Sequence, residues 1–125
     1  MSDQNPTGLK AGALTGLTVL DLSRILAGPT CTQLLGDLGA EVIKIERPGK
    51  GDDTRAWGPP FLKDEEGNDT EESAYYLSSN RNKNAVAINL ARDNGRKLIR
   101  QLAAKADIPV EDFKVRHLER HGPEL

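Results

Sequence analysis

The sequence predicts an α/β fold: a Rossmann-like, open and mainly parallel sheet with flanking helices. Three observations lead to this prediction: short, nearly continuous apolar runs, amphipathic segments between them, and glycine or proline at the junctions. We expect strands near residues 17–22, 41–46, 84–89 and 107–112, and helices near 29–38 and 94–106. Because strands and helices alternate, right-handed crossovers would make neighbouring strands parallel.

The first strand, helix and second strand form a βαβ unit. Residues 17–22 are almost all apolar, which is typical of a strand buried on both faces. Gly28 and Pro29 predict the N-cap and first residue of the helix, and Gly39 predicts a left-handed residue just after its end. Helical spacing predicts a buried apolar face made of Cys31, Leu34, Leu35 and Leu38.

The rest of the chain is less regular. Residues 1–14 are expected to form a flexible leader, and residues 48–69 a long loop in which Trp57 and Phe61 pack on something. Residues 73–79 predict a helical turn, and residues 114–125 a short helical tail. Asp93 predicts the N-cap of a helix whose apolar stripe is Leu98, Ile99, Leu102, Ala103 and Ala106. Pro109 inside the last strand predicts a sheet edge or a break.

Composition excludes several classes of protein. The chain has 125 residues, 17 basic and 19 acidic side chains in a mixed pattern, and a net charge of −2. This pattern predicts no nucleic-acid partner. Cys31 is the single cysteine, so an internal disulfide is excluded, and a reducing, cytoplasmic location is expected. The sequence has neither a secretory signal pattern nor an apolar run that could span a membrane, so no membrane partner is expected.

The loop after the first strand, residues 23–29, lies where a dinucleotide-binding protein carries G-x-G-x-x-G. Only Gly28 is present, and Pro29 removes a backbone donor, which weakens an NAD interpretation although Glu46 lies near the expected ribose position. Arg47 follows the second strand at the edge where ligands bind, and its guanidinium matches the geometry of phosphate. A surface ion pair of Arg47 with Glu46 or Asp53 is the simpler alternative.

No metal site is expected. Asp52 and Asp53 lack further oxygen or histidine ligands nearby and are better explained as turn-forming residues. His117 and His121 have no third ligand close in sequence, so we expect them to be exposed. Two other functions remain open: a non-enzymatic acyl-CoA or nucleotide-binding module, and an NAD(P)-binding Rossmann domain.

Three motifs in order carry a family resemblance: LTVLDLSRILAGPTCTQLLGDLGAEVIKIERP at 17–48, GDDTRAWGPP at 51–60 and SAYYLSSNRNK at 73–83. Together they resemble the start of the family III CoA-transferases of the CaiB/BaiF type, over about residues 17–122. The second and third motifs most resemble the succinate–hydroxymethylglutarate CoA-transferase branch. The resemblance implies transfer of CoA between an acyl-CoA and a dicarboxylic acid, such as succinyl-CoA and glutarate or hydroxymethylglutarate, with no covalently bound cofactor.

The resemblance also implies a CoA-binding site. Its residues would be Arg24, Ile25, Leu26, Ala27, Arg47, Leu77, Asn82, Lys83, Asp112, Phe113 and Arg120. The loop of Arg24 to Ala27 would line the pantetheine, and Arg47 and the Asn82–Lys83 turn would contact the nucleotide. Asp112 stands where the family usually has asparagine, and its charge is expected to repel a phosphate.

Family members use an aspartate that attacks the acyl-CoA thioester, forms a mixed anhydride and releases CoA as a thiolate. The resemblance places that aspartate beyond Leu125, so no catalytic residue is assigned here. Residues 15–125 would be a partial CoA-binding domain, without the family's second domain and its carboxyl-terminal segments. We therefore expect the chain alone to be catalytically silent and, although the family is homodimeric, to self-associate through surfaces that family members cover.

Overall fold

The computed structural model describes residues 11–113. Its elements in chain order are β1 (Thr18–Asp21), α1 (Ala27–Asp37), β2 (Glu41–Glu46), the 3₁₀ helix η1 (Asp53–Ala56), β3 (Phe61–Lys63), β4 (Asp69–Ser73), α2 (Ala74–Ser79), β5 (Lys83–Ala87), α3 (Asp93–Ala103) and β6 (Ile108–Val110). None of the helices in this part of the chain has both the length and the apolar character needed to cross a bilayer.

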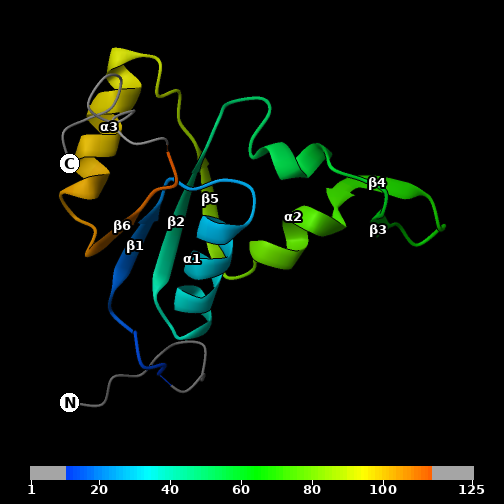
Figure 1. Ribbon diagram of the computed structural model, residues 1–125, viewed down its shortest axis with the longest axis horizontal. Helices are drawn as coiled ribbons and strands as arrows, with labels where there is room; N and C mark the ends of the chain where they lie inside the picture. Colours follow the sequence, from blue (N-terminus) through cyan, green and yellow to red (C-terminus); the bar gives the residue numbers. More distant parts are fainter. Residues whose placement is uncertain (1–10, 114–125) are drawn as a thin grey trace.

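Four strands form one parallel sheet in the order β5-β2-β1-β6. Val19 of β1 lies opposite Val42 of β2 on one side and Ile108 of β6 on the other. Figure 1 shows the two central strands, β1 and β2, with α1 and α3 beside the sheet. The prediction of a parallel α/β sheet is confirmed, and Pro109 lies on an edge strand as expected.

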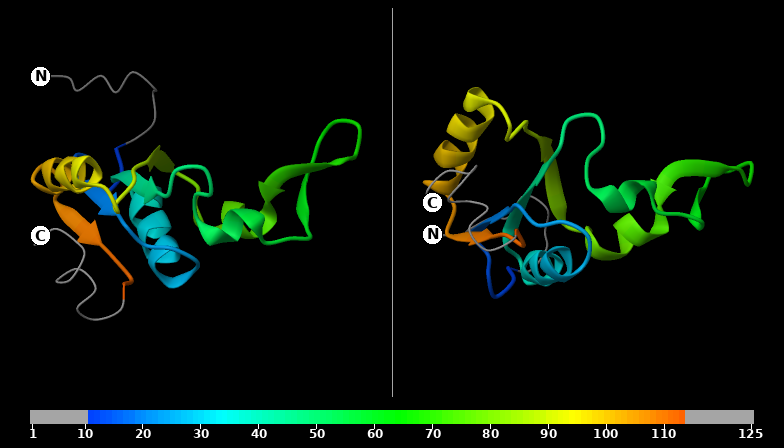
Figure 2. Two further views of the ribbon diagram at one scale, coloured as in Figure 1. Left: turned by 90° about the horizontal axis from the view of Figure 1, so that it is seen from above. Right: turned by 45° about the horizontal axis from the view of Figure 1, so that its top comes forward.

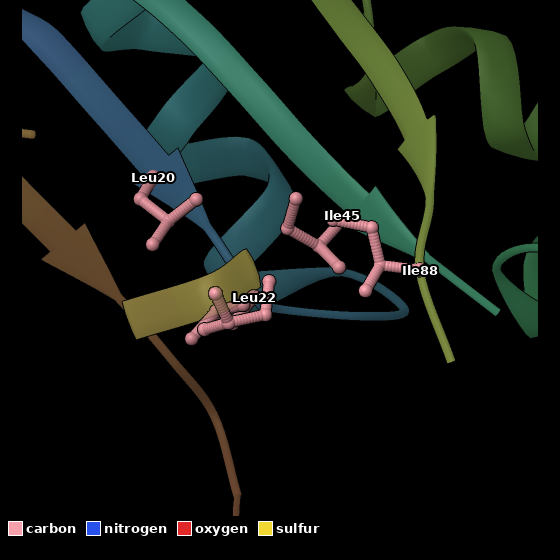
Figure 3. Close-up of a cluster of buried hydrophobic side chains, with 5 residues drawn as sticks. Leu20, Leu22, Ile45 and Ile88 are labelled. Carbon is pink, nitrogen blue, oxygen red and sulfur yellow. The ribbon is translucent and has the colours of Figure 1, made fainter. Parts of the chain in front are cut away.

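Alternating side chains of the central strands bury two apolar clusters, one on each face of the sheet. Leu20 and Leu22 pack with Ile45, Ile88 and Ile99 of α3, and Figure 3 shows the first four of these side chains close together. Val19, Ala40 and Val42 form the other cluster, against which Leu35 of α1 packs. Leu14, in the expected leader, also packs there and donates its N–H to the carbonyl of Leu38, 2.9 Å away.

A segment that the sequence analysis treated as a loop contains secondary structure. Residues 53–79 form η1, the antiparallel β3–β4 hairpin and α2, which project away from the sheet (Figures 1 and 2). The expected loop reached only to residue 69, and the helical turn predicted over residues 73–79 is confirmed as α2. The rings of Trp57 and Tyr75 meet edge to face, with centroids 5.1 Å apart, so the expectation that Trp57 packs on something holds. The hairpin was not predicted because its strands are short and mostly charged or polar, without an apolar alternation.

The start and the buried face of α1 differ from the prediction. Leu26 is the N-cap, so Gly28 and Pro29 lie inside the first turn, while Gly39 has the expected left-handed φ of 104°. Cys31, Leu34 and Leu38 are exposed, and the helix buries Pro29, Thr32 and Gln33 instead. Hydrogen bonds explain why these polar side chains are buried: the hydroxyl of Thr32 donates to the Asp21 carboxylate, and the amide of Gln33 donates to the Ser78 carbonyl.

Three smaller corrections concern the later elements. Asp93 is the first residue of α3, and Arg92 is the N-cap. Leu98 is half-exposed, whereas Ile99 is buried and Leu102, Ala103 and Ala106 pack against it as predicted. The strands β5 and β6 are shorter than predicted: β5 ends at Ala87, although the N–H of Ile88 still donates to the Glu46 carbonyl, and pairing of β6 with β1 ends at Val110.

Candidate functional site

A cavity of about 410 Å³ opens at the carboxyl edge of the parallel sheet. Segments that follow four different strands line it: Ser23 and Arg24 after β1, Arg47 after β2, Asn89 to Ala91 after β5, and Phe113 after β6. In an open α/β sheet the segments after the strands diverge at this edge, which leaves room for a ligand.

The loop between β1 and α1 is held by two carboxylates. Ile25 has a φ of 71°, a strained conformation for a β-branched residue. Its N–H donates to the Asp52 carboxylate at 3.3–3.4 Å, and the N–H of Arg24 donates to Oδ2 of Asp112 at 3.0 Å. Because protein carboxylates already accept from these N–H groups, the loop is not arranged as a pyrophosphate cradle of the dinucleotide-binding type. The Asp112 carboxylate thus faces this loop, and the sequence analysis did not predict its hydrogen bond with the Arg24 N–H.

Lys44 and Asp52 form a fully buried ion pair under the cavity. Nζ of Lys44 lies 3.0 Å from Oδ2 of Asp52 and donates to the Ser23 carbonyl at 3.0 Å. Asp52 also accepts hydrogen bonds from the N–H and hydroxyl of Thr54 and caps η1. Burial opposes ionisation of Asp52, but the hydrogen bonds from Thr54 and Lys44 outweigh it and lower the pKa of this carboxyl. Asp52 thus forms a turn, as predicted, and connects two loops of the site.

Glu46, Arg55 and Tyr76 form a second cluster beside the cavity, in which Glu46 and Tyr76 are buried and Arg55 is partly exposed. Arg55 donates to both carboxylate oxygens of Glu46, at 2.7 and 2.9 Å, and the Tyr76 hydroxyl donates to Oε1 at 2.7 Å. Burial raises the pKa of Glu46, yet these hydrogen bonds, with one from the Asp52 N–H, lower it below its ordinary value overall. Burial and the Glu46 charge raise the pKa of Tyr76. The Glu46 carboxylate is therefore bound by donors of the protein itself and is not turned toward a ribose.

Lys83 is buried under the start of α1. Its ammonium donates to the Pro29 carbonyl at 2.8 Å, to Asn80 Oδ1 at 3.0 Å and to Asp21 Oδ2 at 3.2 Å. Burial lowers the pKa of Lys83, and the nearby Asp21 carboxylate opposes that shift. With three protein oxygens bound, this ammonium supports the β1–α1 loop from below.

The other residues of the expected site fall in three places. Ile25 and Leu26 are exposed on the β1–α1 loop, next to the cavity, Ala27 is exposed at the start of α1, and Leu77 is exposed on α2. Asn82 lies at the opposite, amino edge of the sheet, where its amide donates to Asp37 at 2.8 Å. Arg120, His117 and His121 lie outside the described residues.

Two arginines meet near the cavity. Arg24 and Arg47 both line it, and both pair with Asp53: NH1 of Arg24 is 3.3 Å from Oδ2, and NH2 of Arg47 contacts Oδ1. The pairing of Arg47 with Asp53 was one of the two alternatives weighed from the sequence. The pair Lys44–Asp52 was missed, although a lysine within the apolar run of β2 was a signal, because a cation buried in a parallel strand requires an anion.

Comparison with known proteins gives consistent relationships. Residues 14–124 match the sequence pattern of CoA-transferase family III. Succinyl-CoA:glutarate CoA-transferase from Homo sapiens is 56% identical over 100 residues, which are 80% of this chain and 21% of that protein. Succinate–glutarate CoA-transferase from Agrobacterium fabrum is 45% identical over 87% of this chain and 27% of that protein.

Solved structures give the same relationship at the level of the backbone. A CAIB/BAIF family protein from Brucella suis superposes with a TM-score of 0.82 and 45% sequence identity, over 93% of this chain and 30% of that one. The chain thus spans between about a fifth and a third of the length of these relatives.

Proposed function

The chain belongs to CoA-transferase family III, and on that premise we propose that its carboxyl-edge cavity binds the nucleotide part of coenzyme A. One observation carries the proposal: the guanidinium groups of Arg24 and Arg47 meet at a cavity that also has apolar walls. Coenzyme A carries a 3′-phosphate and a pyrophosphate, and a guanidinium donates two parallel hydrogen bonds to such groups.

The reaction we propose is transfer of CoA between an acyl-CoA and a dicarboxylic acid, with succinyl-CoA and glutarate as the first pair to test. The names of the human and Agrobacterium fabrum relatives support this choice of substrates. The substrates would be the only small molecules required, without a covalently bound cofactor. A homodimer and a cytoplasmic location complete the proposal, the latter supported by the single cysteine.

Individual contacts follow from the geometry of the site. Arg47 would bind phosphate, the exposed loop Ile25 to Ala27 would lie along the pantetheine, and Phe113 would offer its ring from the cavity wall. Asn82, Leu77 and Arg120 remain proposals by resemblance. For Lys83 and Asp112 we propose an indirect role, because both support the β1–α1 loop through hydrogen bonds.

The direct test is the substitution Arg47→Ala. Loss of a guanidinium that binds phosphate should weaken CoA binding by about 1.5–3 kcal/mol, the range for hydrogen bonds to charged groups. Isothermal titration calorimetry with CoA measures this change, and Arg81→Ala is the matched control because Arg81 pairs with Asp37 at the far edge of the sheet. Equal affinities of wild type and Arg47→Ala would contradict the assignment. Preferred binding of NADPH in a parallel titration would favour the dinucleotide alternative.

Catalysis needs a carboxylate that is available to attack a thioester. By resemblance, none of the aspartates between residues 11 and 113 occupies the position of the family's attacking aspartate, so we propose none of them as nucleophile. A polypeptide of these 125 residues should therefore bind CoA without exchanging it between succinyl-CoA and glutarate. A thioester-exchange assay with purified chain measures this, with Asp37→Asn, Asp107→Asn and Asp112→Asn as controls. Measurable turnover would contradict the expectation.

A further inference from the structure

Asp53 occupies an unusual position between two cations of the site. Arg24 comes from the β1–α1 loop and Arg47 from the end of β2, and each binds a different oxygen of the Asp53 carboxylate. All three side chains are partly exposed, at 42%, 50% and 39% for Arg24, Arg47 and Asp53. The two guanidinium groups are thus brought together by one anion at the wall of the cavity.

The neighbouring carboxylates do not share this arrangement. Asp52 is buried against Lys44, and Glu46 is bound by Arg55 and Tyr76. These two anions therefore stay with their own partners. Of these three carboxylates, only Asp53 forms ion pairs with the arginines that line the cavity.

We infer that the Asp53 carboxylate occupies the phosphate position between Arg24 and Arg47 and competes there with the phosphate that the proposed function assigns to these arginines. Two cations with one monoanion keep a net positive charge, which attracts a more highly charged group. A phosphate offers more charge and more acceptor oxygens than a carboxylate, and exposed ion pairs are weak enough to be exchanged. The ligand class is a phosphate of a nucleotide such as coenzyme A, so the inference rests on the proposed function.

The inference predicts that Asp53 opposes phosphate binding. Asp53→Asn removes a negative charge next to the incoming phosphate, which should tighten CoA binding about fivefold at low salt, given the repulsion between like charges about 4 Å apart in water. The gain should shrink at high salt because the charges are exposed. Asp69→Asn is the matched control, since Asp69 forms an exposed pair with Lys63 on the distant hairpin. Unchanged or weaker CoA binding by Asp53→Asn, measured by calorimetry, would overturn the inference.

A second measurement does not depend on CoA. Phenylglyoxal modifies accessible guanidinium groups, and mass spectrometry locates the modified arginines. Arg24 and Arg47 should react faster in Asp53→Asn than in wild type or Asp69→Asn, because their shared partner is weakened. Unchanged rates at both arginines would also overturn the inference.

The two measurements separate the inference from the proposed function. If no variant binds CoA but both arginines react faster in Asp53→Asn, the proposed function fails and the pairing role of Asp53 stands. If CoA binds equally to all variants and the rates are equal, the inference alone fails. Circular dichroism checks that each variant is folded. Asp53→Ser is a second variant that removes the charge, and it should show the same changes in CoA affinity and in phenylglyoxal rate as Asp53→Asn.

Discussion

Glu46 keeps its charge in a buried position because three donors surround it. Arg55 donates twice, and the Tyr76 hydroxyl and the Asp52 N–H each donate once. These hydrogen bonds overcome the cost of burial and lower the pKa of this carboxyl below its ordinary value of 4.5. A lowered folded-state pKa means that the folded protein holds this proton less tightly than the unfolded chain.

The sign of the resulting pH dependence follows from linkage. The stabilisation is complete above about pH 4.5 and is lost as the pH falls through the lower pKa of the folded state. At neutral pH Glu46→Gln should be less stable than wild type by about 1–3 kcal/mol, and the gap should narrow in acid. Urea unfolding at a series of pH values measures it, with Glu41→Gln at the exposed start of β2 as control. A gap that does not depend on pH would contradict this account.

The first turn of helix α3 contains a glycine, Gly95, that the packing requires. A Cβ at Gly95 would lie 1.9 Å from the backbone oxygen of Asn89, so the first turn of α3 sits directly against the segment that follows β5. Gly95→Ala should destabilise the protein by about 1–3 kcal/mol, although alanine is the better helix former. Thermal unfolding measures the loss. Asn94→Ala, on the same exposed turn, should have little effect, and equal behaviour of the two variants would count against this contact.

The elements predicted from the sequence are those with apolar runs and with a glycine or proline at their ends. β1, α1 and β2 were found because residues 17–22 and 42–45 are mostly apolar and Gly39 marks the end of the helix. The β3–β4 hairpin escaped prediction because Asp69–Ser73 is polar throughout. The face of α1 was mispredicted because tertiary hydrogen bonds to Asp21 bury Thr32, an effect that periodicity alone does not contain.

The candidate site, too, was predicted in part and missed in part. Arg47 was predicted because it follows a strand, and the strand ends of a parallel sheet meet at one edge, whereas Arg24 entered through the resemblance, as part of the loop expected along the pantetheine. The structure places both arginines at the cavity, and their roles stay predictions. The buried pair of Lys83 and Asp21 was not predicted, because its partners are 62 positions apart. Pairing at that distance depends on the finished topology.

The molecule as a whole leaves apolar surface open. Leu34 and Leu38 of α1 are 55% and 49% exposed, and both edges of the four-stranded sheet lack a further strand within residues 11–113. Exposed apolar faces and open edges favour association.

Self-association of the purified chain should therefore depend on α1. The variants Leu34→Glu and Leu38→Glu should each weaken it by about 1.5–3 kcal/mol, the value of a buried leucine side chain. Light scattering over a concentration series measures the change. Leu62→Glu on the hairpin is the control, because Leu62 is equally exposed but distant from α1. A monomeric wild type, or a similar loss with Leu62→Glu, would contradict a role of the α1 face.

The buried pair of Lys44 and Asp52 bears on the chemical reactivity of this lysine. Lys44 contributes to the cavity wall, but its side chain is fully buried, and electrophiles that modify amines attack only an accessible, uncharged nitrogen. The nitrogen of Lys44 is committed as a cation to the Asp52 carboxylate and the Ser23 carbonyl. An ammonium has no lone pair with which to attack, so the same contact that fixes the loop also protects this lysine from modification.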